Sequence, residues 1–148
     1  MRRLFLVALV SCGLLAVAGA AQTASRPQTV KNLQITVTAV ERTEKASLRD
    51  CPPGTNTVNA VARAGEQLSV VTVAFKVLPG FQSTPMKRPV VTAADGKTYN
   101  TSVQFVDVGS VPEYSCTFPF RVPEGTKLKS LQIEGTSFDL SALESKTP

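Results

Sequence analysis

The chain has 148 residues, with 16 Lys and Arg against 11 Asp and Glu, a formal net charge of +5, and neither His nor Trp. The absence of His excludes His-ligated metal sites and Ser-His or Cys-His catalysis, and it removes the commonest general base. The basic residues are scattered, whereas nucleic-acid binding normally needs a clustered basic face, so we expect no nucleic-acid partner.

The N-terminal residues have the pattern of a cleavable signal peptide. Arg2 and Arg3 form a cationic start, residues 4–17 are almost entirely apolar, and Ala18-Gly19-Ala20 offers the small residues that a signal peptidase recognises. We therefore assign residues 1–21 to a signal peptide and expect a secreted or periplasmic protein, whose net charge falls from +5 to +3 because Arg2 and Arg3 are removed. The apolar run is too short for a good membrane span, and we expect no transmembrane segment after cleavage.

A lipid anchor at Cys12 is the alternative. Leu9-Val10-Ser11-Cys12 matches the lipobox of bacterial lipoproteins, in which the cysteine becomes the lipidated N-terminus of an envelope-tethered protein with a structural role. Against this, few apolar residues precede Cys12, and the apolar run continues past it, where a lipoprotein normally becomes polar. Cleavage near residue 21 is the favoured interpretation, and lipidation at Cys12 stays open.

After a flexible lead-in over residues 22–28, apolar and polar residues alternate over residues 29–40. The apolar face carries Leu33, Ile35, Val37 and Ala39, a pattern that predicts a half-buried strand. An irregular stretch follows over residues 41–65. Because its Pro52-Pro53-Gly54 cannot continue a strand or a helix, we expect an exposed loop there.

The rest of the chain predicts further strands. Residues 67–77 are apolar on both faces, which indicates a central strand. Residues 89–94 and 97–103 flank Asp95-Gly96, a strong signal for a two-residue hairpin turn, and residues 104–108 either extend the second strand or begin another. Residues 114–122 alternate, with Pro119 marking an edge or a bulge. Residues 128–133 and 137–140 close the fold.

Short strands separated by Gly and Pro, with no convincing amphipathic helix, predict an all-β fold. We expect an antiparallel, immunoglobulin-like β-sandwich of about seven strands over residues 29–141, followed by a flexible tail over residues 142–148. A domain of this size can bury a core without the help of metals.

The order of these motifs resembles the telokin-like, immunoglobulin-fold family of bacterial secreted proteins and lipoproteins. The motifs that carry the resemblance are the strand beginning at Gly65-Glu66-Gln67-Leu68, the hairpin Asp95-Gly96-Lys97-Thr98-Tyr99 and the turn Phe120-Arg121-Val122-Pro123-Glu124-Gly125. The resemblance covers residues 30–140 and extends to a mycobacterial immunoprotective extracellular protein. It implies an extracellular sandwich whose relatives largely lack an assigned activity, and it supplies no catalytic residues.

Cys51 and Cys116 are the only cysteines outside the signal peptide, and export would place them in an oxidising compartment. We therefore predict a disulfide between them, with two free thiols as the alternative. Because Cys51 lies in a Pro-rich loop, we expect the bond to hold this loop to the sheet and not to form an inter-sheet core disulfide. Tyr114, two residues before Cys116, has the spacing of a tyrosine corner.

No motif predicts catalysis, a metal site or a cofactor. The carboxylate pairs Glu41/Glu44, Asp107/Glu113 and Asp139/Glu144 are expected to be exposed, and no calcium-loop or serine-hydrolase motif occurs. The polar loop held by Cys51 is the candidate binding surface, with a simple connection as the alternative. Its candidate contact residues are Arg49, Asp50, Asn56 and Asn59. We expect a non-enzymatic binding module without a cofactor, whose unidentified partner is a protein or an envelope component.

Overall fold

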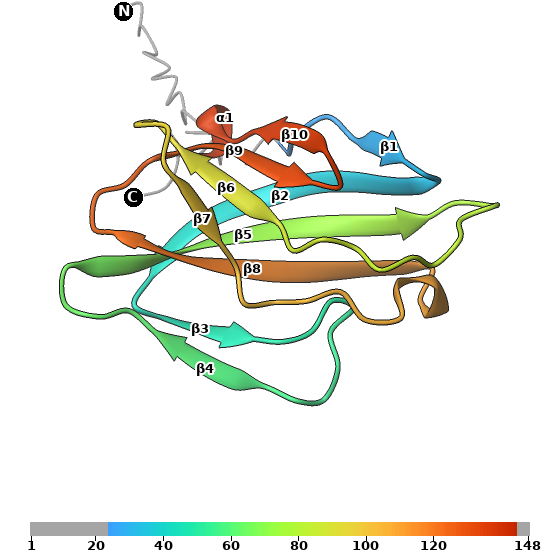
Figure 1. Ribbon diagram of the computed structural model, residues 1–148, viewed down its shortest axis with the longest axis horizontal. Helices are drawn as coiled ribbons and strands as arrows, with labels where there is room; N and C mark the ends of the chain where they lie inside the picture. Colours follow the sequence, from blue (N-terminus) through green and yellow to red (C-terminus); the bar gives the residue numbers. More distant parts are fainter. Residues whose placement is uncertain (1–23, 145–148) are drawn as a thin grey trace, which may run out of the picture.

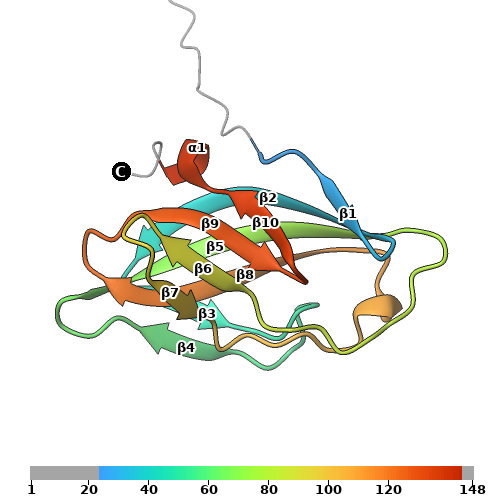
Figure 2. The same ribbon diagram turned by 45° about the horizontal axis from the view of Figure 1, so that its top comes forward.

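The computed structural model describes residues 24–144, which form an antiparallel all-β sandwich of two four-stranded sheets with an additional two-stranded hairpin (Figure 1). The first sheet has the strand order β1-β2-β5-β8, the second has the order β10-β9-β6-β7, and β3 pairs only with β4. Strands β6, β9 and β10 lie across the long strands β2, β5 and β8 (Figure 1, Figure 2). The strands are β1 (Gln28–Val30), β2 (Leu33–Thr43), β3 (Lys45–Leu48), β4 (Val58–Val61), β5 (Glu66–Val77), β6 (Val90–Ala93), β7 (Thr98–Asn100), β8 (Glu113–Pro123), β9 (Leu128–Ile133) and β10 (Thr136–Asp139).

Ten strands occupy the described residues, where the sequence predicted about seven, and the three that were missed are β1, β3 and β4. The single strand expected over residues 29–40 is in fact split into β1 and β2. Lys31 and Asn32 adopt positive φ values of 49° and 61°, and they turn the chain between Val30 and Leu33. Turns with two positive φ values match the natural twist of a hairpin, and here the turn forms without glycine.

The expectation of one exposed loop over residues 41–65 is wrong. Strand β2 continues to Thr43, and β3 and β4 form a hairpin in which Lys45 lies opposite Val61. The longest part of this stretch without strand structure is the connection over residues 49–57, which contains the Pro-Pro-Gly sequence and makes an isolated bridge at Cys51, and Glu44 and residues 62–65 are shorter connections. Each strand of the hairpin is four residues long, and such short alternations are hard to recognise in a sequence.

Strand β2 contains a bulge at Thr38, where its register against β5 shifts between Val37 and Ala39. An extra residue at a bulge moves the following side chains to the other face of the strand. Val40 is therefore the buried residue, at 1% exposed, whereas Ala39, which was expected on the core face, is only half-buried.

The strands expected from residues 67–77 and 114–122 are confirmed as β5 and β8. Strand β5 lies between β2 and β8, as a central strand should, and Pro119 lies on the edge strand β8. The buried side chains of β8 alternate as predicted and pack between the two sheets. Phe118 is fully buried, and its ring centroid lies 6.4 Å from that of Phe75 and 5.8 Å from that of Phe105. Contacts of this kind supply the main hydrophobic stabilisation of the fold.

The hairpin predicted around Asp95-Gly96 is confirmed as β6 and β7, although its turn has three residues and not two. The Ala93 N–H donates to the Lys97 carbonyl at 2.8 Å, and Gly96 takes the left-handed position of the turn, with a φ of 86°. Three-residue hairpin loops commonly use glycine in this way. The Lys97 amide donates to Asp95 Oδ1 at 3.1 Å, and this hydrogen bond lowers the pKa of Asp95.

Residues 104–108 form no strand of a sheet. Phe105 makes an isolated parallel bridge with Cys51, and the chain then enters the short 3-10 helix η1 (Val108–Ser110). Phe105 packs against Phe118 of β8 and Val108 is 2% exposed, so these two apolar residues are explained by packing without a further strand.

Some residues expected in the lead-in and the tail are packed against the sandwich. The Ser25 N–H donates to the Val37 carbonyl and the Val37 N–H donates to Ser25 Oγ, both at 2.8 Å. At the other end, the helical turn α1 (Ser141–Glu144) buries Leu143 and Glu144, which are 1% and 5% exposed. The predicted signal peptide, with Cys12, and residues 145–148 lie outside the described residues.

Candidate functional site

Cys51 and Cys116 form a disulfide, with Cα atoms 5.6 Å apart, so the predicted pairing is confirmed. As expected, the bond holds the 49–57 connection to β8 and does not join the two four-stranded sheets, and both cysteines are buried in the hydrophobic core, at 0% and 2% exposed. The chain between β3 and β4 enters the core at Cys51. The Cys51 N–H donates to the Gln104 carbonyl at 3.0 Å, and the Cys51 carbonyl accepts from the Val106 N–H at 2.8 Å. The connection over residues 49–57 is therefore anchored at its start.

The four predicted binding residues lie on the β3–β4 hairpin but do not converge on one point. Arg49 and Asp50 follow β3, Asn56 precedes β4, and Asn59 lies within β4. Asp50 is half-buried and the other three are exposed. Among the described residues, no hydrogen bond or ion pair joins any two of these four side chains. Only Asn59 belongs to the groove described below.

The β3–β4 hairpin covers one end of the outer face of the first sheet, beside β8 (Figure 1). Leu68 and Val70 point to this outer face, yet they are only 1% and 7% exposed. Strand β3 contacts both β5 and β8, and its Leu48 is half-buried. A small apolar layer under the hairpin thus explains why β5 is apolar on both faces.

The outer edge of β4 is not paired with another strand. The Ala62 N–H donates to the Glu44 carbonyl at 2.8 Å, and this bond fixes which pairs of the hairpin are hydrogen-bonded. Along an antiparallel hairpin, hydrogen-bonded pairs alternate with pairs that are not hydrogen-bonded. The main-chain N–H and carbonyl groups of Asn59 and Val61 therefore point away from β3. The Val61 carbonyl accepts from Arg121 Nη2 at 2.8 Å. Within residues 24–144 the Asn59 N–H, the Asn59 carbonyl and the Val61 N–H have no hydrogen-bond partner, so the edge of β4 is largely open.

Strand β4 also carries exposed apolar side chains. Val58 is 65% exposed and Val61 is 48% exposed, and Val106 is the other large apolar side chain exposed in the described part of the chain. The two β4 valines are three positions apart and therefore lie on opposite faces of the strand. Soluble proteins generally avoid apolar residues on open edges, because such edges pair with other chains.

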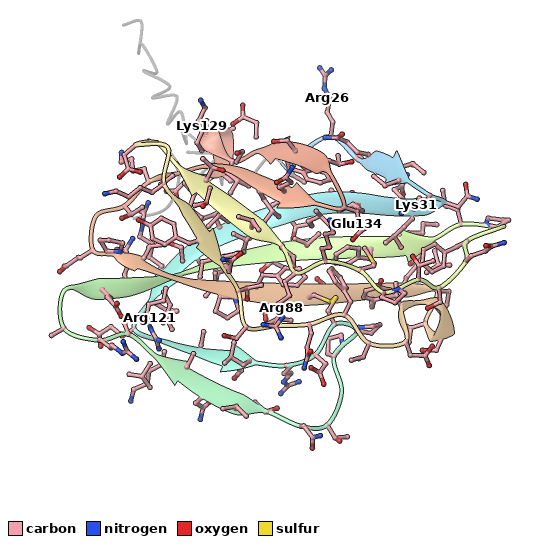
Figure 3. All side chains as sticks on the ribbon, viewed as in Figure 1. Arg26, Lys31, Arg88, Arg121, Lys129 and Glu134 are labelled. Carbon is pink, nitrogen blue, oxygen red and sulfur yellow. A yellow bond between two sulfur atoms is a disulfide. The ribbon has the colours of Figure 1, made fainter. Side chains whose placement is uncertain are left out.

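A groove of about 330 Å³ lies beside the β4 edge. Its apolar lining includes Leu48, Leu68 and Pro119, and its polar lining includes Asn100, Ser102 and Arg121. Figure 3 shows Arg121 at the end of the molecule where β8 approaches the hairpin. Besides its bond to the hairpin, Arg121 Nε lies 3.3 Å from Glu66 Oε2. The sequence analysis did not single out Arg121. The only signal for it was the alternation along β8, which places Arg121 on the outer face of the strand.

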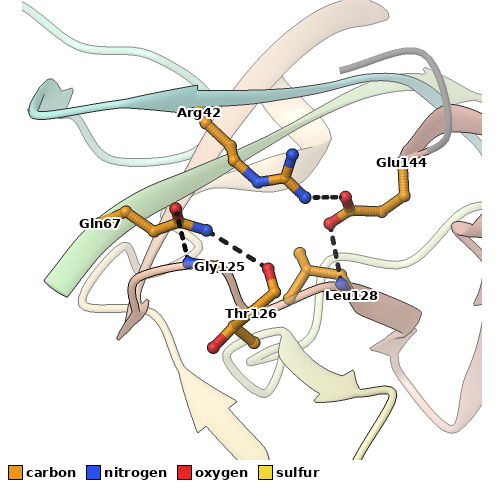
Figure 4. Close-up of polar contacts among 6 residues, drawn as sticks. All are labelled: Arg42, Gln67, Gly125, Thr126, Leu128 and Glu144. Atoms are coloured by element: carbon orange, nitrogen blue, oxygen red, sulfur yellow. Dashed lines mark hydrogen bonds and ion pairs between the residues drawn. The ribbon is translucent and has the colours of Figure 1, made fainter. Parts of the chain in front are cut away.

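A polar cluster joins β2 and β5 to the β8–β9 turn, β9 and α1 (Figure 4). Arg42 Nη2 forms an ion pair with Glu144 Oε2, and the Leu128 N–H donates to Glu144 Oε1 at 2.8 Å. The side chains of Arg42 and Glu144 are 20% and 4% exposed. The expectation that Glu144 is exposed is therefore wrong. Its carboxylate tolerates burial because it has both a cation and a main-chain donor.

Gln67 makes a second link in the same cluster (Figure 4). Its Nε2 donates to the Thr126 carbonyl at 3.3 Å, and its Oε1 accepts from the Gly125 N–H at 3.3 Å. The adjacent hollow of about 520 Å³ is lined by side chains of both charges. Together the two links tie the first sheet to the β8–β9 turn and to α1, which is a structural role.

Tyr114 does not form the expected tyrosine corner. Its ring stacks on Phe75, with centroids 5.1 Å apart, and its buried hydroxyl has no hydrogen-bond partner in the described part of the protein. Burial raises the pKa of Tyr114 above its ordinary value of 10.0, so the side chain stays neutral.

The described part of the chain, residues 24–144, contains no group of three or more Cys, Asp or Glu side chains placed to hold a metal ion. It also contains no helix of the length and apolar character needed to cross a membrane.

Comparison with known proteins identifies no family for this chain. No family model matches the sequence and no curated protein matches it, so the resemblance to the telokin-like family is not confirmed. Among solved structures, the chain is similar to an uncharacterised β-sandwich protein from Clostridium difficile 630, at 12% sequence identity and a TM-score of 0.48. The similarity covers 78% of this chain and 89% of that chain.

Proposed function

We propose that the chain is exported and that its sandwich, of the immunoglobulin-like, telokin-like type, is a non-enzymatic binding module. The partner is a protein or an envelope component, and it is captured on the β3–β4 hairpin and its 49–57 connection. The observation that carries the proposal is the open β4 edge, where Val58 and Val61 are 65% and 48% exposed beside a groove of about 330 Å³.

Two further features support this assignment. The 49–57 connection is exposed for most of its length but is anchored in the core through Cys51, so it is a surface loop on a rigid support. Loops held in this way often carry recognition. Of the three exposed large apolar side chains in the described residues, Val58 and Val61 lie on the hairpin, Val106 lies between β7 and β8, and none lies in the two four-stranded sheets.

The proposal is tested by partner capture from the native envelope, with the exported protein as bait. Replacement of the four predicted residues by Ala (Arg49→Ala, Asp50→Ala, Asn56→Ala, Asn59→Ala) should weaken capture while leaving the melting temperature nearly unchanged. A matched variant changes four exposed residues of the second sheet and its hairpin turn (Lys97→Ala, Lys129→Ala, Gln132→Ala, Ser137→Ala) and should capture the partner normally. Equal capture by both variants, or turnover in a hydrolase screen that survives the hairpin changes, contradicts the proposal.

The export step has its own test, the intact mass of the mature protein. A chain that begins at Ala21 or Gln22 supports a freely exported module. A diacylglycerol-modified Cys12 at the N-terminus instead supports the alternative, an envelope-tethered lipoprotein with a structural role.

A further inference from the structure

We infer that the free edge of β4 binds an extended polypeptide segment, which joins the β3–β4 hairpin as a third strand. The inference rests on the proposed function, because it names the class of partner that the hairpin takes. Strand addition uses main-chain hydrogen bonds for affinity and alternate side chains for specificity. The β4 edge offers the groups that both of these need.

The main-chain groups on offer are the Asn59 N–H, the Asn59 carbonyl and the Val61 N–H. They point away from β3, as the register anchored by the bond between Ala62 and Glu44 requires. An N–H and a carbonyl on one residue match the same two groups on a facing residue, as in a hydrogen-bonded pair of antiparallel strands. A glycan or a lipid headgroup has no such pair repeated at strand spacing, so the edge favours a polypeptide.

Arg121 sets the end of this edge. Its guanidinium bonds the Val61 carbonyl at 2.8 Å and lies 3.3 Å from Glu66 Oε2. An added strand therefore ends beside Val61, unless it displaces this guanidinium. Short edges and charged side chains are devices that stop uncontrolled pairing. The β4 edge has both devices, and they restrict it to short partner segments without closing it.

The side chains around the edge indicate the composition of the partner. Because Val58 and Val61 lie on opposite faces of β4, an added strand meets an apolar neighbour on each face. On the inner side its side chains lie over the groove, where Leu48 is half-buried and Leu68 and Pro119 form a buried apolar floor. No aromatic residue lines this groove. The partner is accordingly an extended, uncharged segment rich in Val, Ile and Thr.

The test uses a capped, fluorescein-labelled peptide with three Thr-Val repeats as the probe and measures its binding to the exported protein by anisotropy. Asn59→Pro removes an outward N–H without touching the hydrogen bonds to β3, and it should weaken binding by about tenfold or more. Asn59→Ala removes the same side chain but keeps the N–H, so its effect should be smaller. Thr29→Pro removes an outward N–H from the β1 edge of the first sheet, according to the register of the β1–β2 hairpin, and should bind the probe normally.

Amide hydrogen exchange supplies a second readout that does not depend on a variant folding. The probe should slow exchange at the Asn59 and Val61 amides by about tenfold or more. The Ala60 amide, which the same register pairs with β3, is the internal control and should not change.

Three results would overturn the inference. The first is unchanged binding of the probe to Asn59→Pro, and the second is no added protection at Asn59 and Val61. The third is protection of these amides that rises with protein concentration without the probe, which makes a second copy of the chain the occupant. If the four-residue alanine variant loses partner capture while Asn59→Pro retains it, strand addition fails but the proposed function stands. If neither change affects capture, both fail.

Discussion

The sandwich core and the β3–β4 hairpin are built from the same kind of strand but treat apolar side chains in opposite ways. In the core, Phe118, Phe120 and Phe138 are at most 1% exposed. On β4, Val58 and Val61 are 65% and 48% exposed. The difference indicates that stability is concentrated in the sandwich, while the hairpin is held in place without being fully covered. Binding surfaces often occupy regions of this second kind.

The two regions are joined at specific points, and each point offers a way to test the comparison. The disulfide anchors the hairpin connection in the core, and Arg121 holds the β4 edge to β8. The Arg42–Glu144 ion pair, in contrast, serves the sandwich alone. Changes in the sandwich should therefore lower stability, and changes on the hairpin surface should alter binding.

The largest effect is expected from Cys51→Ala combined with Cys116→Ala. The bond joins residues 65 positions apart, and the chain-entropy model gives a loss of about 4 kcal/mol in the free energy of unfolding. Urea denaturation of the oxidised wild type and the double variant measures this difference. Partner capture should fall as well, because the 49–57 connection loses its anchor. A variant as stable as the wild type would show that the hairpin is held without the bond.

The next effect is expected from Arg42→Met, which leaves the buried Glu144 carboxylate without its cation. Loss of one partner of a buried ion pair is strongly destabilising. Because the Arg42 side chain is 20% exposed, we expect a loss of about 2 to 3 kcal/mol, below the range for a fully buried pair. Lys76→Met is the matched control, since Lys76 and Glu113 form an ion pair that is 54% and 66% exposed and should contribute nothing measurable. Equal effects of the two variants would contradict a structural role for Arg42.

A smaller effect of opposite sign is expected from Tyr114→Phe. Because the buried hydroxyl has no partner in the described residues, its removal should stabilise the protein by up to about 1 kcal/mol at neutral pH. The advantage should grow above pH 10. There the unfolded wild type loses the Tyr114 proton near the ordinary pKa of 10.0, while the folded protein keeps it because burial raises the pKa, so wild-type stability falls as the pH rises. Thermal melts of both proteins between pH 7 and about 11 measure this difference, and parallel pH profiles would contradict it.

Much of the sandwich could be predicted because its longest strands carry regular patterns of apolar side chains. Strands β5 and β8 have twelve and eleven residues, so the continuous apolar run of β5 and the alternation of β8 are both clear in the sequence. The elements that were missed depend on tertiary contacts. The bulge at Thr38, the turn at Lys31 and Asn32 and the four-residue strands of the hairpin leave no comparable local pattern.

The candidate site could be predicted only in part. The polar loop around Cys51 led to the same hairpin that we propose as the binding surface, and to Asn59, which lines the groove. Arg121 lies 60 residues from Val61 in sequence, and nothing local links them. Glu144 and Arg42 are 102 residues apart, so the burial of that carboxylate was equally hidden. Contacts between distant residues are fixed by the packing of the sheets, which a single sequence does not reveal.

The smallest effect on stability is expected from Val61→Thr, a substitution of nearly equal size that keeps the branched Cβ. Val61 is 48% exposed, so its new hydroxyl stays in water and the free energy of unfolding should change by less than about 0.5 kcal/mol. The same substitution in the core, Val71→Thr, buries a hydroxyl at a position that is 0% exposed and should cost about 1 to 3 kcal/mol. Urea denaturation of the two variants therefore compares the two regions with identical chemistry. Probe binding should separate them in the other direction, because Val61→Thr removes an apolar contact for an added strand while Val71→Thr leaves the β4 edge intact. If both variants lose similar stability, the hairpin is as tightly packed as the core, and the contrast between a stabilising sandwich and a binding hairpin fails.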